Sequence, residues 1–414
     1  MTDTPAIASM AGTAGLDPVR QPAQASAQAS AQASAQAGAP AVPVVKAERD
    51  LRLDLFRGLA LWFIFLDHVP ENVVSWLTVR NYGFSDATEI FVYISGYTAV
   101  IAYARMMQRN GWPRAAARIW RRVWQLYVAH ILLFVVFTAQ IAWVSLKSDA
   151  QSLLEEMQLL GLGQDPYRAI LEAALLKFRP TNLDVLPLYI VLLAVFPLVL
   201  PLVVRWPLRV IAGSVVLYAL TLHFDWNLPG YPEPKVWFFN PFAWQVVFYT
   251  GAAFAVLGPK LAWLDRWRLP ISIAALLFLL FAGFIVLTWH YNSMERLLPE
   301  LAARYIYPID KTNVDILRFL HFLAIAWFVR MFVPKDAAFL HWPVLQPVRR
   351  CGEHSLQVFC LGTFLALSAE IVNTFFEDSV VSQIVVSLTG IAIMCGIAYG
   401  AHWFKAEARP EAFT

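Results

Sequence analysis

Ten apolar stretches, each about as long as a lipid bilayer requires, follow one another along this chain. A hydrocarbon core about 30 Å thick needs roughly 20 residues of helix. Hydrophobic residues make up 59% of the 414 positions and charged residues 15%, which is more apolar than a soluble domain needs for its core. The sequence therefore predicts an all-α, polytopic membrane protein. Ten spans are expected, near residues 57–78, 87–107, 120–146, 185–204, 207–222, 242–258, 269–289, 316–334, 355–372 and 380–403.

The basic residues predict the orientation of these spans. Arginines are concentrated in four connections, at residues 105–122, 205–209, 259–268 and 334–350. Loops rich in Lys and Arg stay on the cytoplasmic side, so both termini are expected in the cytoplasm. Three longer polar loops would face the other side, which in a bacterial inner membrane is the periplasm. These loops are residues 147–184, 223–241 and 290–315.

Charge and cysteine content exclude several other classes of protein. The formal net charge is only +3, and the basic residues lie in short loops, so no nucleic-acid partner is expected. The three cysteines, Cys351, Cys360 and Cys395, form no C-x-x-C pair. Neither a disulfide framework nor a zinc site is expected, and no other metal site is predicted.

The first 47 residues differ from the rest of the chain. They contain a low-complexity Ala/Gln/Ser run with almost no large apolar residue, which cannot bury enough surface to offset the entropy of ordering. They also lack the basic and apolar regions of a signal peptide. We predict a disordered cytoplasmic tail over residues 1–47 and a membrane-embedded domain over residues 48–414.

The first span, "RGLALWFIFLDH", carries ionisable residues at both ends. Arg57 and His68 are eleven residues apart, which on a regular helix separates them by about 16 Å along the axis and about 20° around it. Asp54 is placed to pair with Arg57. Ionisable groups in a span usually face the bundle interior, so Asp67 and His68 are candidate functional residues. Equally, Arg57 could be a cytoplasmic anchor and His68 an interfacial residue.

These residues carry a resemblance to a known family. Arg-x(10)-His in the first span, followed by "ATEIFVYISGY" in the second, resembles the membrane-bound acyltransferase-3 superfamily. The stretches "TNLDVLPLYIVLL", "FNPFAWQVVFYTGA", "DKTNVDILRFLHFLAIAW" and "GEHSLQVFCLGTFLAL" resemble its OpgC branch, the succinyltransferases of osmoregulated periplasmic glucans. The resemblance extends over about residues 50 to 400.

The resemblance implies transfer of an acyl group from a coenzyme A thioester to a sugar hydroxyl. It places the catalytic His and Arg of the family at His68 and Arg57. His68 suits a general base for the hydroxyl, and Asp67 is expected to hold its ring. Arg57 lies too far along the helix to share an atom with His68, so we expect it to bind an anionic part of the donor. No cofactor is expected to stay bound, and the choice of succinyl-CoA as donor rests on the resemblance alone.

Further polar residues are candidates for binding donor or acceptor. Each has a structural alternative: Glu89 favours a helix N-terminus, Asn182 and Asp184 suit helix caps, and interfacial aromatic groups such as Trp244 with Gln245 are expected in any membrane protein. Three more candidate residues are spaced three apart on one face of the eighth span. They are Asp315, Arg318 and His321. The structural alternative to a binding role is a salt-bridged network among them.

Two alternative functions remain open from the sequence. Ionisable residues in spans also mark transport paths, although no internal repeat pairs the two halves of this chain. An acyltransferase that modifies another envelope polysaccharide would carry the same motifs. The chain has no Gly-x-Ser-x-Gly, Walker or His-Glu-x-x-His motif, so neither a covalent serine intermediate nor a catalytic metal is supported.

Overall fold

A computed structural model describes residues 49–148, 157–291, 294, 303–304 and 306–407. The chain divides into two units, Met1–Pro43 and Val44–Thr414. The first unit, and with it the predicted disordered tail, lies outside the described residues.

The described part of the chain is helical; its only β-structure is two isolated bridges, Phe178 with Tyr231 and Pro229 with Val236. The longer helices are α2 (Leu51–Asp67), α3 (Ala87–Asn110), α4 (Trp112–Ser148), α7 (Pro166–Ala174), α8 (Val185–Arg205), α9 (Pro207–Phe224), α10 (Pro241–Leu257), α11 (Arg268–His290), α14 (Ile316–Phe332), α15 (Gln346–Glu353), α16 (Ser355–Phe375) and α17 (Val380–Glu407). The short ones are α6 (Leu160–Gln164) and the 3-10 helices η1 (Val73–Leu77), η2 (Val79–Tyr82), η3 (Gly258–Trp267), η4 (Ala338–His341) and η5 (Pro343–Leu345).

Each of the ten predicted spans contains a long helix. Seven segments of the described chain are long and apolar enough to cross a membrane: α3, α4, α8, α9, η3 with α11, α16 and α17. The other three, α2, α10 and α14, have 17 residues each, somewhat fewer than the roughly 20 that a bilayer core needs. The chain is therefore an all-α protein with seven candidate spans, and the full count of ten stays a prediction.

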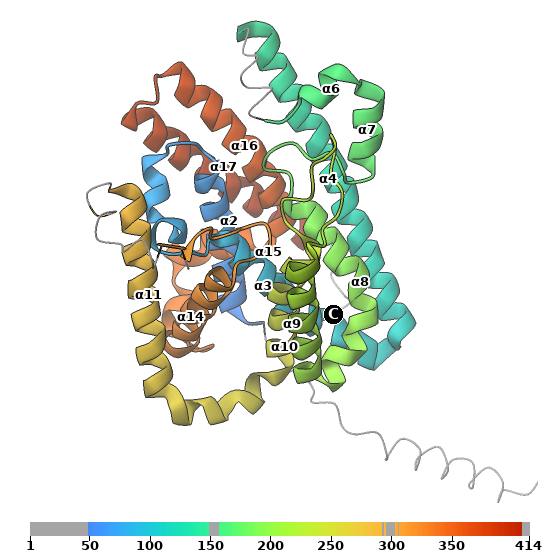
Figure 1. The fold of residues 1–414 in the computed structure, drawn as a ribbon, viewed down its shortest axis with the longest axis vertical. Coiled ribbons are helices and arrows are strands. Elements are labelled where there is room, and N and C mark those ends of the chain that lie inside the picture. Colours follow the sequence, from blue (N-terminus) through green and yellow to red (C-terminus); the bar gives the residue numbers. More distant parts are fainter. Residues whose placement is uncertain (1–48, 149–156, 292–293, 295–302, 305, 408–414) are drawn as a thin grey trace, which may run out of the picture. The chain divides into compact units, whose positions relative to one another are not determined.

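Helices α2 and α3 lie between two groups of helices (Figure 1). Helix α2 contacts α15 and α16 on one side, and α3 contacts α8 and α10 on the other. Glycines allow two of these contacts to be close: a Cβ atom at Gly96 of α3 would overlap the Phe248 carbonyl, and one at Gly251 of α10 would overlap the Tyr93 carbonyl. Small residues of this kind let membrane helices approach backbone to backbone.

The first helix differs from the prediction of a span over residues 57–78. It begins after Asp50, whose side chain accepts a hydrogen bond from the Arg52 backbone, and it ends at Asp67. Pro70 follows closely and disfavours helical backbone before it. The chain then turns back, where the Asn72 side chain donates to Ser387 Oγ at 3.0 Å on α17. His68 consequently lies at a helix end, not inside a continuous span.

Candidate functional site

A cavity of about 630 Å³ opens where α2 ends and α3 begins. Its other walls come from all three long polar loops of the chain, including residues 157–158, 177–184, 230–239 and 309–311. Six basic side chains line it: Arg80, Lys177, Arg179, Lys235, Lys311 and Arg318. Four acidic side chains face them: Asp67, Asp86, Asp184 and Glu370. Aromatic rings complete the lining: Phe84, Tyr231, Phe238, Phe239 and Trp289.

His68 faces this cavity from the C-terminal end of α2. Its Nδ1 lies 2.5 Å from the carbonyl oxygen of Ile64, one helical turn earlier. A carbonyl oxygen can only accept a hydrogen bond, so Nδ1 carries the proton of the neutral ring and Nε2 carries the lone pair. The ring also borders an apolar gap of about 10 Å³ between α2 and α16. His68 thus offers a basic nitrogen at the junction of a polar and an apolar space.

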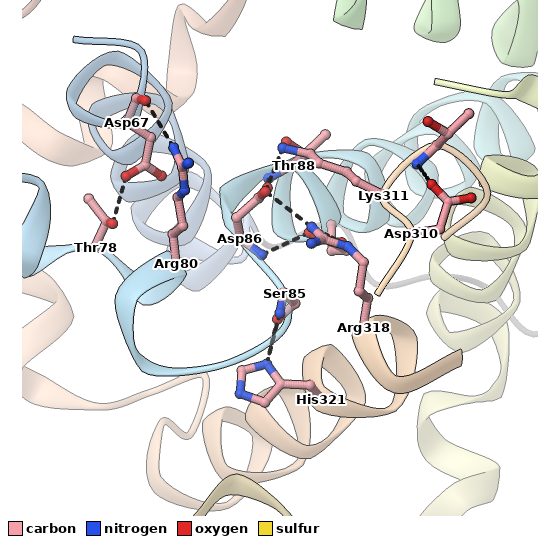
Figure 2. Close-up of polar contacts among 12 residues, drawn as sticks. Asp67, Thr78, Arg80, Ser85, Asp86, Thr88, Asp310, Lys311, Arg318 and His321 are labelled. Atoms are coloured by element: carbon pink, nitrogen blue, oxygen red, sulfur yellow. Dashed lines mark hydrogen bonds and ion pairs between the residues drawn. The ribbon is translucent and has the colours of Figure 1, made fainter. Parts of the chain in front are cut away.

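Asp67 does not hold the His68 ring, so this part of the prediction is wrong. The Asp67 carboxylate accepts a hydrogen bond from Thr78 Oγ1 at 2.7 Å, and its backbone carbonyl accepts one from Arg80 at 3.2 Å (Figure 2). Successive side chains of a helix point about 100° apart, so adjacent residues do not face each other. The backbone carbonyl of Ile64 orients the ring instead.

Arg57 lies in the middle of α2 and does not line the cavity. Its guanidinium donates to Thr98 Oγ1 at 2.6 Å and to the Ile94 carbonyl at 3.4 Å, both on α3. The predicted pair with Asp54 is wrong, because Asp54 pairs with Arg49 at 2.6 Å. The Nε atom of Arg57 is buried without a hydrogen-bond partner among the described residues. This arginine is therefore held by neutral oxygens alone within the described part of the chain.

A buried ion-pair network joins the start of α3 to α14 (Figure 2). Arg318 donates to Glu89 at 2.8 Å and to Asp86 at 3.1 Å, while Lys311 reaches the same Asp86 oxygen at 2.6 Å. Asp86 and Glu89 also form a capping box, in which the Glu89 side chain accepts from the Asp86 backbone at 2.9 Å. Glu89 is completely buried and does not line the cavity. Glu89 therefore has the structural role that the sequence allowed, as an acidic residue at a helix N-terminus, and it also pairs with Arg318.

The electrostatics of Asp86 follow from this network. Burial alone would raise the pKa of the Asp86 carboxyl, but the adjacent Lys311 ammonium and Arg318 guanidinium outweigh burial and hold that pKa well below its usual range. Asp86 is therefore ionised at any physiological pH. One carboxylate shared by two cations places both of them at the wall of the cavity.

Of the three residues spaced along α14, only Arg318 reaches the cavity. Asp315 caps the helix by accepting from the Leu317 backbone at 2.8 Å. His321 is buried, with Ser85 Oγ 2.7 Å from its Nδ1. The His321 ring lies so close to Gly83 that no side chain fits at that position. His321 thus supports the loop before α3 and is not exposed to the cavity as an alternative base.

Asp184 and Asn182 both line the cavity. Asp184 occupies the N-cap position of α8, as its structural alternative predicted, but its side chain makes no capping hydrogen bond. Instead it accepts from Arg179 Nε at 2.8 Å, and the Arg179 guanidinium lies 4.2 Å from the centre of the Trp237 ring. Burial raises the pKa of the Asp184 carboxyl, although the Arg179 charge opposes this shift. Asn182 has a left-handed backbone with φ of 72°.

Trp244 and Gln245 are buried beside the cavity and do not line it. Trp244 Nε1 donates to the Lys311 carbonyl at 3.2 Å, which fixes the backbone that carries the Lys311 ammonium. Gln245 exchanges hydrogen bonds with Ser214 of α9. Both residues therefore hold neighbouring elements in place and do not face the cavity.

Sequence reasoning missed several cavity residues. Arg80, Lys177 and Lys235 sit in loops without periodicity, where only tertiary folding decides what faces inward. Asp86 had a usable signal, because Asp-x-x-Glu before an apolar run is a capping-box pattern. For the others we find no sequence signal.

A cluster of potential metal ligands lies outside the cavity, near the start of α16. Glu353, His354 and His402 bring ligand atoms within 4.8 Å of one another. However, Arg350 Nη1 lies 2.8 Å from Glu353 and 2.9 Å from His402 Nδ1, and Arg49 pairs with Glu353 at 3.1 Å. Two guanidinium groups already occupy these acceptors, which favours an ion-pair cluster over a metal site.

Seven candidate membrane spans and a charged cavity lined by His68 are typical of a multi-pass membrane protein with a candidate site for a polar substrate. The family model described as OpgC protein matches residues 49–406, and the chain belongs to this family. Membership implies a role as a succinyltransferase of osmoregulated periplasmic glucans. No curated protein and no solved structure matches the chain.

Proposed function

We propose that the protein moves a succinyl group from cytoplasmic succinyl-CoA to a glucan hydroxyl held in the cavity, with His68 as the general base. Family membership supports the glucan acceptor and the succinyl group. The observation that carries the residue assignment is the His68 ring, whose Nε2 is left as the proton acceptor beside a cavity of about 630 Å³.

The proposed reaction is a direct transfer. His68 Nε2 takes the proton of the glucan hydroxyl while its oxygen attacks the thioester carbonyl carbon. The C–O bond forms, the C–S bond breaks, and the coenzyme A thiolate then takes the proton from His68. A positioned base of this kind typically contributes about 10²- to 10⁴-fold to the rate.

Polar and aromatic groups of the cavity suit a sugar acceptor. Asp184 and Asn182 present a carboxylate and an amide, and the Tyr231 ring lies in the same wall. Sugar hydroxyls bond to such polar groups, while the apolar faces of pyranose rings stack on aromatic rings. We assign the acceptor to this part of the cavity.

Arg57 is assigned to the donor. It lies about 16 Å along α2 from His68 on nearly the same face, and Leu61 and Ile64 between them border the apolar gap next to His68. A thioester whose acyl end reaches His68 would place an anionic part of coenzyme A toward Arg57.

Arg57→Lys loses the planar fork that binds phosphate with two parallel bonds. We expect this variant to raise the KM for the acyl donor about tenfold and to leave the KM for glucan unchanged, as measured with purified protein. Unchanged donor kinetics would indicate a simple anchor.

The proposed setting is a bacterial inner membrane, with ten spans and both termini in the cytoplasm. Ion pairs surround the start of α2: Arg49 pairs with Glu353, and both Arg52 and Lys335 pair with Asp50. The three long polar loops meet at the cavity near the other end of this helix. This separation of basic connections from polar loops is what the positive-inside rule predicts.

The central test uses a strain that lacks the gene. Periplasmic glucans are isolated and analysed by mass spectrometry after complementation with wild type, His68→Ala or His68→Gln. We expect succinyl groups with wild type only, at equal amounts of membrane-inserted protein. His223→Ala, which removes an exposed histidine outside the cavity, serves as the control and should restore succinylation. Normal succinylation with His68→Ala would contradict the base assignment, and succinylated glucan in the deletion strain would contradict the function.

A further inference from the structure

Two cations lie beside His68 in the cavity and are only partly satisfied. Arg80 donates to the backbone carbonyl of Asp67 at 3.2 Å and forms no ion pair with a carboxylate among the described residues. Its side chain is exposed to the cavity. Lys311 shares the Asp86 carboxylate with Arg318, and 32% of its side chain remains exposed. Burial lowers the pKa of the His68 ring most, and both of these charges lower it further.

The other cavity cations are already engaged elsewhere. Arg179 is paired with Asp184 and stacks on Trp237. Lys177 pairs with Glu172 at 3.3 Å, and Lys235 donates to Gln158 at 3.2 Å. Arg318 has two carboxylates of its own, Asp86 and Glu89. Lys177 and Lys235 also keep N–H donors, but Arg80 donates to Asp67, the neighbour of His68, and Lys311 pairs with Asp86 at the start of α3, where the cavity opens. Arg80 and Lys311 are therefore the cations with remaining donors at the His68 end of the cavity.

Contacts within the protein hold the backbone at both cations and the Lys311 ammonium. Arg80 belongs to η2, whose turn is held by a hydrogen bond from the Asn81 side chain to the Ser75 carbonyl at 2.7 Å. The Lys311 backbone is held by Trp244. Figure 2 shows Arg80 and Arg318 on opposite sides of Asp86, with Lys311 reaching toward the same carboxylate. A donor that is already held in place, as the Lys311 ammonium is, loses less side-chain freedom when an anion binds.

We infer that Arg80 and Lys311 form the subsite for the distal carboxylate of the succinyl group and so select succinyl over uncharged acyl donors. This inference rests on the proposed function. A succinyl thioester differs from a butyryl thioester of similar length mainly by a terminal carboxylate, whereas an unsubstituted glucose chain offers no anion. With the carbonyl carbon at His68, that carboxylate extends two methylenes into the cavity toward the two cations. A guanidinium and an ammonium that line one cavity can each donate charge-assisted hydrogen bonds to a carboxylate.

The test compares donors in the full-length protein reconstituted in lipid nanodiscs. Succinyl-CoA and butyryl-CoA compete for unsubstituted glucan, and mass spectrometry gives the ratio of the two products. For Arg80→Gln we expect the succinyl-to-butyryl ratio to fall at least about tenfold, with butyryl transfer unchanged or faster. Arg80→Lys, which keeps the charge, should recover part of the ratio. Arg304→Gln, an exposed arginine outside the cavity, is the matched control and should keep the wild-type ratio.

Two further arms separate the possible outcomes. A wild-type ratio in Arg80→Gln would overturn the inference. An increased KM for already succinylated glucan, with an unchanged donor ratio, would also overturn it and assign the cations to the acceptor. Binding of free succinate against butyrate, followed by tryptophan fluorescence, tests the subsite even if wild type transfers no acyl group. In that case the proposed function fails, while succinate binding that Arg80→Gln weakens would still support the subsite.

Discussion

At His68, a backbone carbonyl takes the place that a carboxylate holds in a Ser-His-Asp triad. The Ile64 oxygen fixes the ring tautomer and its direction, but it carries no full charge to stabilise the imidazolium. Burial is the main cause that lowers the pKa of the His68 ring; the Lys311 and Arg80 charges add to this shift, while the Ile64 carbonyl and the Asp86 carboxylate oppose it. His68 is therefore suited to accept a proton only briefly, which fits a step in which the leaving thiolate takes that proton at once.

Asp86 allows a prediction about stability and pH. Asp86→Asn removes the charge shared by Lys311 and Arg318, and we expect it to lower the free energy of unfolding by about 3 kcal/mol. Because the folded-state pKa lies below the ordinary value of 3.8, the stabilisation by Asp86 is complete above that value and is lost only as pH falls through the folded-state pKa. The difference between variant and wild type should therefore be the same at pH 7 and pH 5.

Thermal unfolding of the detergent-solubilised protein at the two pH values measures this difference. Asp265→Asn removes an exposed pair with Arg330 and is the control, with an expected loss below about 1 kcal/mol. A variant as stable as wild type at pH 7 would show that the network does not stabilise the fold.

At the scale of elements, the contact between α3 and α10 depends on reciprocal glycines. Gly96 and Gly251 each lie against a backbone carbonyl of the facing helix, so neither position has room for a side chain. The same arrangement recurs between α2 and α15, where Gly58 faces Val348 and Gly352 faces Asp54. These two contacts hold α3 against α10 and α2 against α15, and the cavity opens where α2 ends and α3 begins.

Gly96→Val should force α3 and α10 apart. We expect an apparent loss of at least about 1–3 kcal/mol in stability, seen as a lower unfolding temperature in detergent or as failure to insert. Gly213→Ala is the matched control, because open space surrounds that glycine on α9 and its extra methyl group meets no neighbour. If Gly96→Val were as stable as Gly213→Ala, the close approach would not be needed for folding.

At the scale of the whole molecule, a histidine at the C-terminal end of α2 and an arginine in the middle of that helix suit the proposed reaction, which joins substrates from two compartments. The polar cavity receives all three long loops, while the apolar gap between α2 and α16 borders the same histidine. Residues 149–156 and 295–302, within two of these loops, lie outside the described residues. The proposed orientation places the cavity in the periplasm and both termini in the cytoplasm.

Reporter fusions test this orientation directly. Alkaline phosphatase is active only outside the cytoplasm, whereas green fluorescent protein exported unfolded is dark. We expect a fluorescent but phosphatase-inactive fusion at the C-terminus, and an active phosphatase when it is inserted after residue 228 in the loop following α9. The reverse pattern would place the cavity in the cytoplasm and contradict a periplasmic acceptor.

The sequence by itself determined the helical class, the positions of ten long helices and the candidate histidine. These follow from local properties: a bilayer demands continuous apolar runs, and the short motif around His68 is contiguous in the chain. Only the tertiary structure decided which polar groups meet. The Asp67 carboxylate accepts a hydrogen bond from Thr78, Asp54 pairs with Arg49, and the buried Glu89 pairs with Arg318. Arg80 and Lys311, 231 positions apart, reached one cavity because the intervening helices fold back, and such long-range pairing leaves no periodic trace in a single sequence.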